Sequence, residues 1–157
     1  EIIFKTPGLR FDHPSLIRAS ENGSIITSEM EVFFEVCPSK IIAVTGSDGK
    51  TTTTTLIYKI LTESGYKCHL GGNIGTPLLD RLDEMQESDS LVLELSSFQL
   101  MRVSRSPFAV AITNLSQNHL DWHKDFEEYK TKPYKGFQRF CGVNSIALQQ
   151  RRCIFAT

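Results

Sequence analysis

Short apolar runs recur along the chain and mark the strands of a sheet. Residues 41–44, 91–95 and 108–113 are mostly apolar, and each run is only a few residues long. Runs of this kind are typical of strands that are buried on both faces of a parallel sheet. A shorter strand is expected at 66–70, and an extended stretch at 24–27.

The segments between these runs have apolar residues at helical spacing. After residue 50, one helix face is formed by Leu56, Ile57, Ile60 and Leu61. Gly65 follows where a left-handed residue would end that helix, and residues 71–75 form a glycine-rich turn. Another helix is expected from Pro77, with an apolar stripe made by Leu78, Leu79, Leu82 and Met85. Together with a helix at 14–19, this alternation predicts an α/β fold, a layered parallel sheet with flanking helices.

Composition narrows the class of protein. The 157 residues fit one domain, or one domain with part of another. With 40% hydrophobic residues, 22% charged residues and a net charge of -1, the chain is of the globular kind and has no basic field to recruit nucleic acid. Its apolar runs are far shorter than the roughly 20 residues that span a bilayer. We therefore expect a cytoplasmic, monomeric protein that binds neither nucleic acid nor membrane, with reduced cysteines.

A glycine loop at 44–52 joins the first strong strand to the first strong helix. Glycines let the backbone turn its N–H groups inward, and the helix start adds unsatisfied donors, so the loop can hold a polyphosphate. Val44 stands where the common phosphate-loop signature has its first glycine, which makes this loop shorter. The alternative is a glycine turn that caps a helix. The predicted ATP-binding residues are Gly46, Ser47, Asp48, Gly49, Lys50, Thr51 and Thr52.

Within this loop, Lys50 would neutralise the β- and γ-phosphates, and the Thr51 hydroxyl would reach Mg²⁺. Glu94 lies inside a strand of apolar residues, where a carboxylate is costly unless it is paired or bound to metal. A hard oxygen ligand suits Mg²⁺, and the alternative is an outward-facing or hydrogen-bonded glutamate.

Polar residues after two strands are candidates for substrate contact. Asn73 lies between glycines, where its amide could reach a substrate or simply occupy a left-handed turn. Ser96, Ser97 and Gln99 follow the carboxyl end of a strand, where open α/β sheets bind ligands. Serines at this position also cap helices. His119 lies in a polar segment, and a lone histidine there is usually only solvated.

Four segments of the chain resemble one enzyme family. The loop Thr-Gly-Ser-Asp-Gly-Lys-Thr is similar to the T-G-[TS]-[ND]-G-K-T motif of the Mur ligases and folylpolyglutamate synthases, which form amide bonds with ATP. Residues 71–75, 93–100 and 113–121 resemble further motifs of the family in the same order. Ser-Ser-Phe-Gln at 96–99 is similar to the branch of the family that adds D-glutamate.

This resemblance implies a P-loop NTPase-like central domain that is incomplete in this chain. It implies transfer of a phosphoryl group from ATP, with Mg²⁺, to the carboxylate of UDP-N-acetylmuramoyl-L-alanine, followed by attack of D-glutamate. The implied catalytic residues are Lys50, Glu94 and His119; the implied metal ligands are Thr51, Glu94 and His119; the implied substrate contacts are Asn73, Ser96, Ser97 and Gln99. Alternatives are another ligase of the family and a non-catalytic ATP-binding fragment.

The resemblance also divides the chain. Residues 1–36 resemble the end of the family's N-terminal domain, which binds the uridine diphosphate part of the substrate; 37–135 resemble part of the central domain, and 136–157 form an atypical tail. Where the family has a metal-bridging lysine, this chain has Pro133, and Lys132 lies one residue early. One residue rotates a helical side chain by about 100°. We therefore expect a truncated or frameshifted product that binds ATP but does not form the amide bond.

Overall fold

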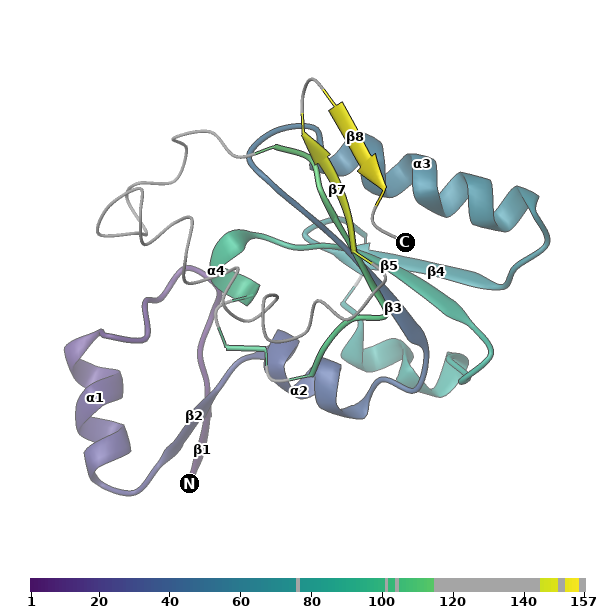
Figure 1. Ribbon diagram of the computed structural model, residues 1–157. Helices are drawn as coiled ribbons and strands as arrows, with labels where there is room; N and C mark the ends of the chain where they lie inside the picture. The colour runs from purple at the N-terminus through teal and green to yellow at the C-terminus, as the bar shows by residue number, and fades with distance from the viewer. Residues whose placement is uncertain (76, 101, 104, 115–144, 150–151, 156–157) are drawn as a thin grey trace.

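The structure, a computed structural model, describes residues 1–75, 77–100, 102–103 and 105–114, together with the backbone of two strands near the C-terminus (Figure 1). The elements in chain order are β1 (Ile2–Phe4), α1 (Pro14–Glu21), β2 (Ile25–Thr27), α2 (Glu29–Val36), β3 (Lys40–Thr45), α3 (Lys50–Glu63), β4 (Cys68–Gly72), the 3₁₀ helix η1 (Leu79–Glu84), β5 (Ser90–Glu94), α4 (Ser97–Leu100), β6 (Ala109–Ile112), β7 (Ser145–Gln149) and β8 (Arg152–Phe155).

A six-stranded sheet forms the centre of the molecule, in the order β4-β5-β3-β6-β7-β8. The first five strands pair in parallel, and β8 pairs antiparallel with β7. The predicted α/β fold with a parallel sheet is therefore confirmed. Because β3 lies between β5 and β6, the loop that follows it emerges between the carboxyl ends of its two neighbours. In register, Val44 pairs with Glu94 and Thr45 pairs with Ile112.

Apolar side chains cover both faces of this sheet. One cluster joins strand residues such as Ala43 and Leu93 to the α2 residues Met30, Phe33 and Phe34. The other joins Val44, Val92 and Ala111 to the α3 residues Ile57, Tyr58 and Leu61. Alternate residues of a strand point to opposite faces of the sheet, so one strand contributes side chains to both clusters. Burial on both faces explains why the strands are runs of apolar residues rather than alternating ones.

Helix α3 turns a different face to the sheet from the one predicted. Leu56 and Ile60 are 56% and 53% exposed, whereas Thr54 is fully buried. The inward face runs through Thr54, Ile57, Tyr58 and Leu61, at the expected helical spacing but rotated. A threonine can be buried here because its hydroxyl donates to the carbonyl of Lys50 at 2.8 Å, which leaves no unpaired group.

The helix predicted from Pro77 is instead the 3₁₀ helix η1, Leu79–Glu84. Its apolar residues were identified correctly, since Leu78 and Met85 are buried in the core. Leu78 and Met85 anchor the two ends of the segment in the core. A 3₁₀ helix spans more distance per residue than an α-helix, so it can connect these two anchored ends. The predicted turn at 71–75 is also shorter than expected, because Gly71 and Gly72 are the last residues of β4.

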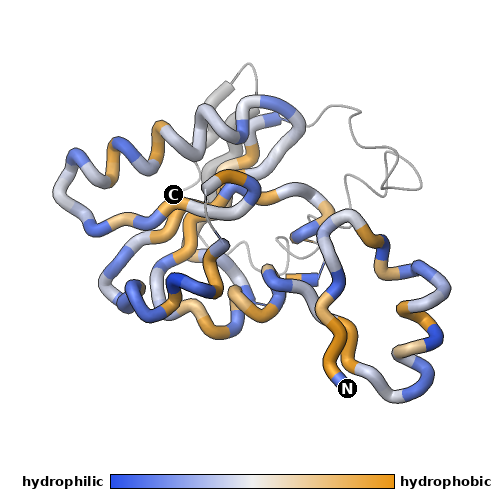
Figure 2. Tube along the Cα trace, turned by 180° about the vertical axis from the view of Figure 1, so that it is seen from behind, coloured by the Kyte–Doolittle hydropathy of each residue, from blue (hydrophilic) through white to orange (hydrophobic). Residues whose placement is uncertain are grey.

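Residues near the N-terminus form a separate two-stranded parallel sheet, in which β1 pairs with β2. The predicted helix and extended stretch are present as α1 and β2. The apolar stretches of the two strands lie side by side (Figure 2), and Ile2, Phe4 and Ile25 are exposed.

Helix α2 was not predicted, although it supplies part of the main core. Its signal is the Ser-x-x-Glu spacing of a capping box at Ser28 and Glu31; the Ser28 hydroxyl accepts from the Glu31 N–H, and the Glu31 carboxylate accepts from the same hydroxyl. β7 and β8 lie in the tail, for which the sequence pattern gave no strand. None of the helices in the described parts of the chain has the length and apolarity needed to cross a membrane.

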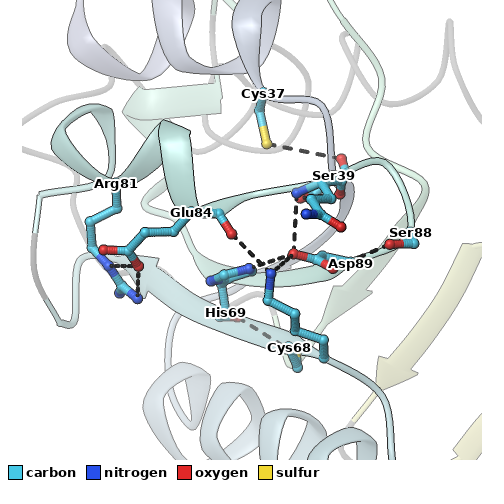
Figure 3. A network of polar contacts seen from close by, with 10 residues as sticks. Cys37, Ser39, Cys68, His69, Arg81, Glu84, Ser88 and Asp89 are labelled. Atoms are coloured by element: carbon cyan, nitrogen blue, oxygen red, sulfur yellow. Dashed lines mark hydrogen bonds and ion pairs between the residues drawn. The ribbon is translucent and has the colours of Figure 1, made fainter.

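A buried polar network lies around Asp89, beside the first residue of β5 (Figure 3). The Asp89 carboxylate receives the Lys67 ammonium at 2.8 Å, His69 Nε2 at 2.9 Å and the Gln86 N–H at 3.1 Å. Its side chain is only 2% exposed. These partners, with the hydrogen bond from Lys67 the largest cause, hold the pKa of Asp89 well below its usual range. The network ties β4 to the turn that precedes β5.

Replacing this carboxylate gives a pH-dependent test. Asp89→Asn is expected to lower the melting temperature by several degrees near pH 7, because the half-exposed Lys67 and the buried His69 lose their charged partner. A lowered folded-state pKa means that the stabilisation is complete above the unfolded value of about 3.9 and fades as the pH falls further. In thermal melts between pH 7 and pH 2.5, the gap between wild type and variant should therefore begin to narrow below about pH 4 and should not close by pH 2.5, because the folded-state pKa of Asp89 lies well below its usual range. The exposed Asp83→Asn serves as control; a gap that persists undiminished at the acid end would contradict this account.

Candidate functional site

The loop between β3 and α3 is shaped by two glycines with positive φ. Gly46 has φ 134° and Gly49 has φ 77°. A Cβ on Gly46 would overlap the Thr113 hydroxyl and lie 2.8 Å from the Asn114 carbonyl oxygen, so no other residue fits. Gly49 is the N-cap of α3 and has open space around it. The loop is therefore pressed against the end of β6 on one side and open on the other.

The open side leads to the start of α3. The Thr53 N–H, which donates to the Gly49 carbonyl at 3.0 Å, closes the first turn of the helix. The backbone N–H groups of residues 49–52 come before the Thr53 N–H in the chain, and no carbonyl of the helix accepts from them. Together with the positive end of the helix dipole, they are donors of the kind that bind anions. This geometry agrees with the predicted phosphate loop, and ATP binding by these residues stays a prediction.

The Lys50 side chain folds back over this loop. Its ammonium donates to the carbonyl oxygens of Gly46 at 2.8 Å and Ser47 at 2.9 Å. The charge is therefore held at the loop rather than extended into solvent. A phosphate bound to the amides at the start of the helix would meet this ammonium directly.

Glu94 and Thr51 face each other across the loop. Glu94 is 5% exposed, and its carboxylate accepts from the Thr51 hydroxyl at 2.8 Å. Of the alternatives to a metal ligand, the outward-facing glutamate is thus wrong, and the hydrogen-bonded glutamate agrees with the structure. A carboxylate and a hydroxyl are hard oxygen donors of the kind that bind Mg²⁺ together with phosphate oxygens, so this pair fits that ion. No group of three or more His, Cys, Asp or Glu side chains suited to a metal occurs in the described part of the chain, and His119 lies outside it.

Three of the four predicted substrate residues meet at the carboxyl ends of β4 and β5. The Asn73 side chain donates to the Ser96 hydroxyl, and the Asn73 N–H donates to the Glu94 carbonyl at 2.8 Å. Gln99 uses its amide oxygen to accept from the Ser96 N–H at 2.8 Å, which caps α4. The alternative assigned helix capping to the serine side chains, whereas this bond is made by the Gln99 side chain. Ser97 is buried in the first turn of α4.

Asn114 completes the site and was given no role from the sequence. Its side-chain oxygen accepts from the Asp48 N–H at 2.8 Å and from the Ser47 N–H at 3.0 Å. Its side-chain nitrogen donates to the Asp48 carboxylate at 3.4 Å. Two sequence signals could have found it: its position directly after the last apolar strand run, where ligands gather in open sheets, and its place in the segment 113–121 that resembles a family motif.

Two hollows adjoin the N-terminal segment rather than the loop. The larger, of about 440 Å³, lies beside α1 and β2 and is lined by residues such as Leu16 and Ile26. The smaller, of about 30 Å³, has Gln99 on its wall together with Lys5 and Arg102. Gln99 therefore borders the N-terminal segment, so the region of α4 is shared between that segment and the carboxyl ends of the strands of the large sheet.

Comparison with known proteins accounts for this arrangement. The sequence profile of the Mur ligase middle domain matches residues 44–144, which include the loop, Glu94 and Asn114. The chain belongs to the Mur ligase family. Members of this family use ATP, in agreement with the loop geometry.

Two similar relatives of this Mur ligase chain are UDP-N-acetylmuramoylalanine--D-glutamate ligases. That of Acetivibrio thermocellus is 61% identical over 129 residues, which are 82% of this chain and 28% of the relative. That of Clostridium novyi is 52% identical over 151 residues, which are 96% of this chain and 33% of the relative. The chain thus spans about a third of the length of the curated relatives it matches.

Two solved structures share the fold. The UDP-N-acetylmuramate-alanine ligase of Thermotoga maritima is 21% identical, with a TM-score of 0.59 over 97% of this chain and 39% of that one. The UDP-N-acetylmuramate:L-alanyl-gamma-D-glutamyl-meso-diaminopimelate ligase of Neisseria meningitides is 18% identical, with a TM-score of 0.63 over 96% of this chain and 52% of that one. At such identities the likeness supports the Mur ligase fold alone.

Proposed function

We propose that this chain carries the ATP-binding part of a ligase that adds D-glutamate to UDP-N-acetylmuramoyl-L-alanine. One observation supports this most strongly: Lys50 and the Thr51–Glu94 pair lie together at the open start of α3. The curated names of its relatives supply the substrates, and the Ser-Ser-Phe-Gln segment at 96–99 favours the same branch of the family.

The proposed reaction has two steps. An oxygen of the substrate carboxylate attacks the γ-phosphorus of ATP, the bond from that phosphorus to the β,γ-bridging oxygen breaks, and an acyl phosphate and ADP form. The amine of D-glutamate then attacks the acyl carbon, phosphate leaves, and the amine loses a proton as the amide forms. A carboxylate must approach a triphosphate, so the protein's task is to neutralise and align like charges.

Each predicted residue has a place in this task. The backbone N–H groups of the loop bind the phosphates, and Lys50 neutralises the β- and γ-phosphates. Mg²⁺, when bound, would supply further positive charge at the phosphates. Thr51, Glu94 and His119 would hold it. Asn73, Ser96, Ser97 and Gln99 would contact the muramoyl substrate; the Gln99 nitrogen is the group that remains for this, because its oxygen caps α4.

We propose further that the chain alone binds ATP without forming the amide bond. In this division, residues 1–36 belong to the domain that binds the uridine diphosphate moiety, 37–135 to the central domain and 136–157 to an atypical tail. The chain would act as a monomer in the cytoplasm.

Thermal stabilisation by nucleotide tests the proposal. A ligand that binds only the native state raises the melting temperature in proportion to its binding free energy. We expect Mg²⁺ with ATP to raise it, ADP to raise it less, and AMP, which lacks the β- and γ-phosphates, to leave it unchanged. Equal responses to ATP and AMP, or none, would refute a phosphate site. Incubation with both substrates and ATP should give no amide product; measurable ligation would refute the separation of binding from ligation.

The Glu94 carboxylate gives a test of the metal. Glu94→Gln preserves the volume and an acceptor for Thr51 but removes the charge that would attract Mg²⁺. We expect Mg²⁺ to strengthen ATP binding by wild type and to have little effect on the variant, whose affinity at saturating Mg²⁺ should fall about tenfold or more. Calorimetric titrations with and without Mg²⁺ measure this, with the exposed Glu87→Gln as control. An unchanged Mg²⁺ dependence in Glu94→Gln would exclude Glu94 as a ligand.

A further inference from the structure

Asn114 and Lys50 hold the same two peptide groups from opposite sides. The Gly46–Ser47 peptide group gives its carbonyl to the Lys50 ammonium at 2.8 Å and its N–H to the Asn114 side-chain oxygen at 3.0 Å. The next peptide group, Ser47–Asp48, does the same at 2.9 Å and 2.8 Å. The carbonyl and the N–H of a trans peptide point in opposite directions, so the two side chains lie on opposite sides of the loop.

This arrangement fixes the direction of both peptide dipoles. With Asn114 accepting from both N–H groups, the two carbonyls can point only toward Lys50. A chain without this acceptor would leave the Asp48 N–H to find another partner and the Ser47 N–H with the Asn114 backbone carbonyl, and a glycine at position 46 gives the backbone freedom to rotate. Rotation of either peptide would remove a carbonyl from the Lys50 ammonium and release the charge from its position.

The end of β6 holds the loop in this state by contact as well. The Ser47 N–H also lies 3.1 Å from the Asn114 backbone carbonyl oxygen, and Gly46 packs against Thr113 with no room for a Cβ. The strand end and the Asn114 side chain therefore form one rigid support, which the loop meets before any nucleotide arrives. A site that is ordered in advance binds more tightly because less ordering remains for the ligand to cause.

We propose that Asn114 is a positioning residue of the phosphate loop, which orients the Gly46–Ser47 and Ser47–Asp48 peptides so that their carbonyls hold Lys50 over the nucleotide phosphates. The Asn114 side chain accepts from the Ser47 and Asp48 N–H groups, so the N–H groups of residues 49–52 remain for the anion. This inference rests on the proposed ATP-binding function. It adds a residue that does not touch the nucleotide and acts through Lys50.

The neighbouring Asp48 allows a charge-neutral rescue experiment. The Asn114 nitrogen donates to the Asp48 carboxylate at 3.4 Å. Asn114→Asp alone keeps the acceptor oxygen but sets two carboxylates against each other. Combining it with Asp48→Asn exchanges the amide and the carboxylate: the acceptor for the two N–H groups is kept, the contact is restored with reversed polarity, and the net charge is unchanged.

Titrations of Mg²⁺ and ATP into the full chain test the proposal. Asn114→Ala should weaken binding about tenfold, as expected for loss of oriented hydrogen bonds. Asn114→Asp should weaken it at least as much, and the exchanged pair should return to within about threefold of wild type. Thr62→Val is the matched control, because it also removes a side-chain bond to a backbone carbonyl, that of Tyr58 at 2.8 Å, but at the end of α3 far from the loop. Wild-type affinity in Asn114→Ala, or an exchanged pair as weak as Asn114→Asp, would overturn the proposal.

Amide hydrogen exchange in the unliganded chain separates this inference from the proposed function. The Asp48 amide should exchange faster in Asn114→Ala than in wild type, with the melting temperature nearly unchanged; the Ser47 amide, which keeps the Asn114 backbone carbonyl as acceptor, should change less. If the wild-type chain did not bind ATP, the proposed function would fail, but the exchange rates would still show whether Asn114 orients the loop. Equal rates in wild type and variant would show that it does not orient the loop.

Discussion

Lys50→Ala should lower the affinity for ATP with Mg²⁺ by at least about a hundredfold, the largest effect on binding expected from one side chain in the described site. The ammonium is already held over the loop by the carbonyls of Gly46 and Ser47, so binding a phosphate requires little rearrangement. Charge-assisted hydrogen bonds are each worth roughly 1.5–3 kcal/mol, and about 2.7 kcal/mol corresponds to a factor of a hundred. Isothermal titration of both proteins measures the difference.

Lys59→Ala is the matched control for this variant. Lys59 lies on the same helix and is exposed, so its removal changes the net charge equally without touching the loop. We expect its affinity to stay within about twofold of wild type, since a distant exposed charge is screened by salt. Lys50→Arg should fall between the two, because the charge remains while the planar guanidinium does not match the two loop carbonyls. If Lys50→Ala and Lys59→Ala bound ATP equally well, the phosphate loop would be wrongly assigned.

The loop itself could be predicted because its information is local. Strand, glycines, Lys50 and helix follow one another within a dozen residues, and each has a direct physical reason. Asn114 could not be predicted in the same way. Its contacts with Ser47 and Asp48 join residues 66 or 67 positions apart, and only the placement of β6 beside β3 brings them together. The pairing of Thr51 with Glu94, separated by 43 positions, likewise depends on the strand order.

The sheet was predicted more completely than the helices that cover it. Strands buried on both faces leave uninterrupted apolar runs, which have few other interpretations. Two overlapping faces of helix α3 could have packed on the sheet. The predicted face contains more apolar residues, but the observed face is rotated from it and includes Thr54. Thr54 decides the outcome: with its hydroxyl bonded to the Lys50 carbonyl it can be buried, and Leu56 and Ile60 are left exposed. Hydrophobicity alone carries no information about this internal hydrogen bond.

Gly72→Ala should destabilise the fold more than any other substitution considered. Gly72 has φ 98° and pairs with Glu94 across β4 and β5. A Cβ there would overlap the Glu94 carbonyl oxygen and lie 2.9 Å from its carbon and 3.0 Å from the Glu94 nitrogen. These are backbone atoms of a central strand and cannot rotate away as a side chain could. The two strands would have to separate at the residue that carries the Thr51 contact.

Gly65→Ala isolates the part of this cost that comes from backbone conformation. Gly65 has φ 86°, close to that of Gly72, but nothing lies within 4 Å of the position of its Cβ. An alanine in the left-handed region costs about 1 kcal/mol. Adding steric overlap with the backbone should bring Gly72→Ala to roughly 4 kcal/mol or more, a large share of the stability of an ordinary domain. Urea unfolding followed by circular dichroism measures both.

Comparing Gly72→Ala with Gly65→Ala also separates an effect on stability from an effect on ATP binding. Where Gly72→Ala still folds at low temperature, Glu94 and the Asn73 N–H that bonds its carbonyl should be displaced, and Mg²⁺-dependent ATP binding should weaken. Gly65→Ala lies at the far end of α3 from the loop, so it should lose stability without losing affinity. Equal destabilisation of the two variants would mean that β4 and β5 tolerate a side chain at this contact, and that the close approach at Gly72 does not hold Glu94 in place.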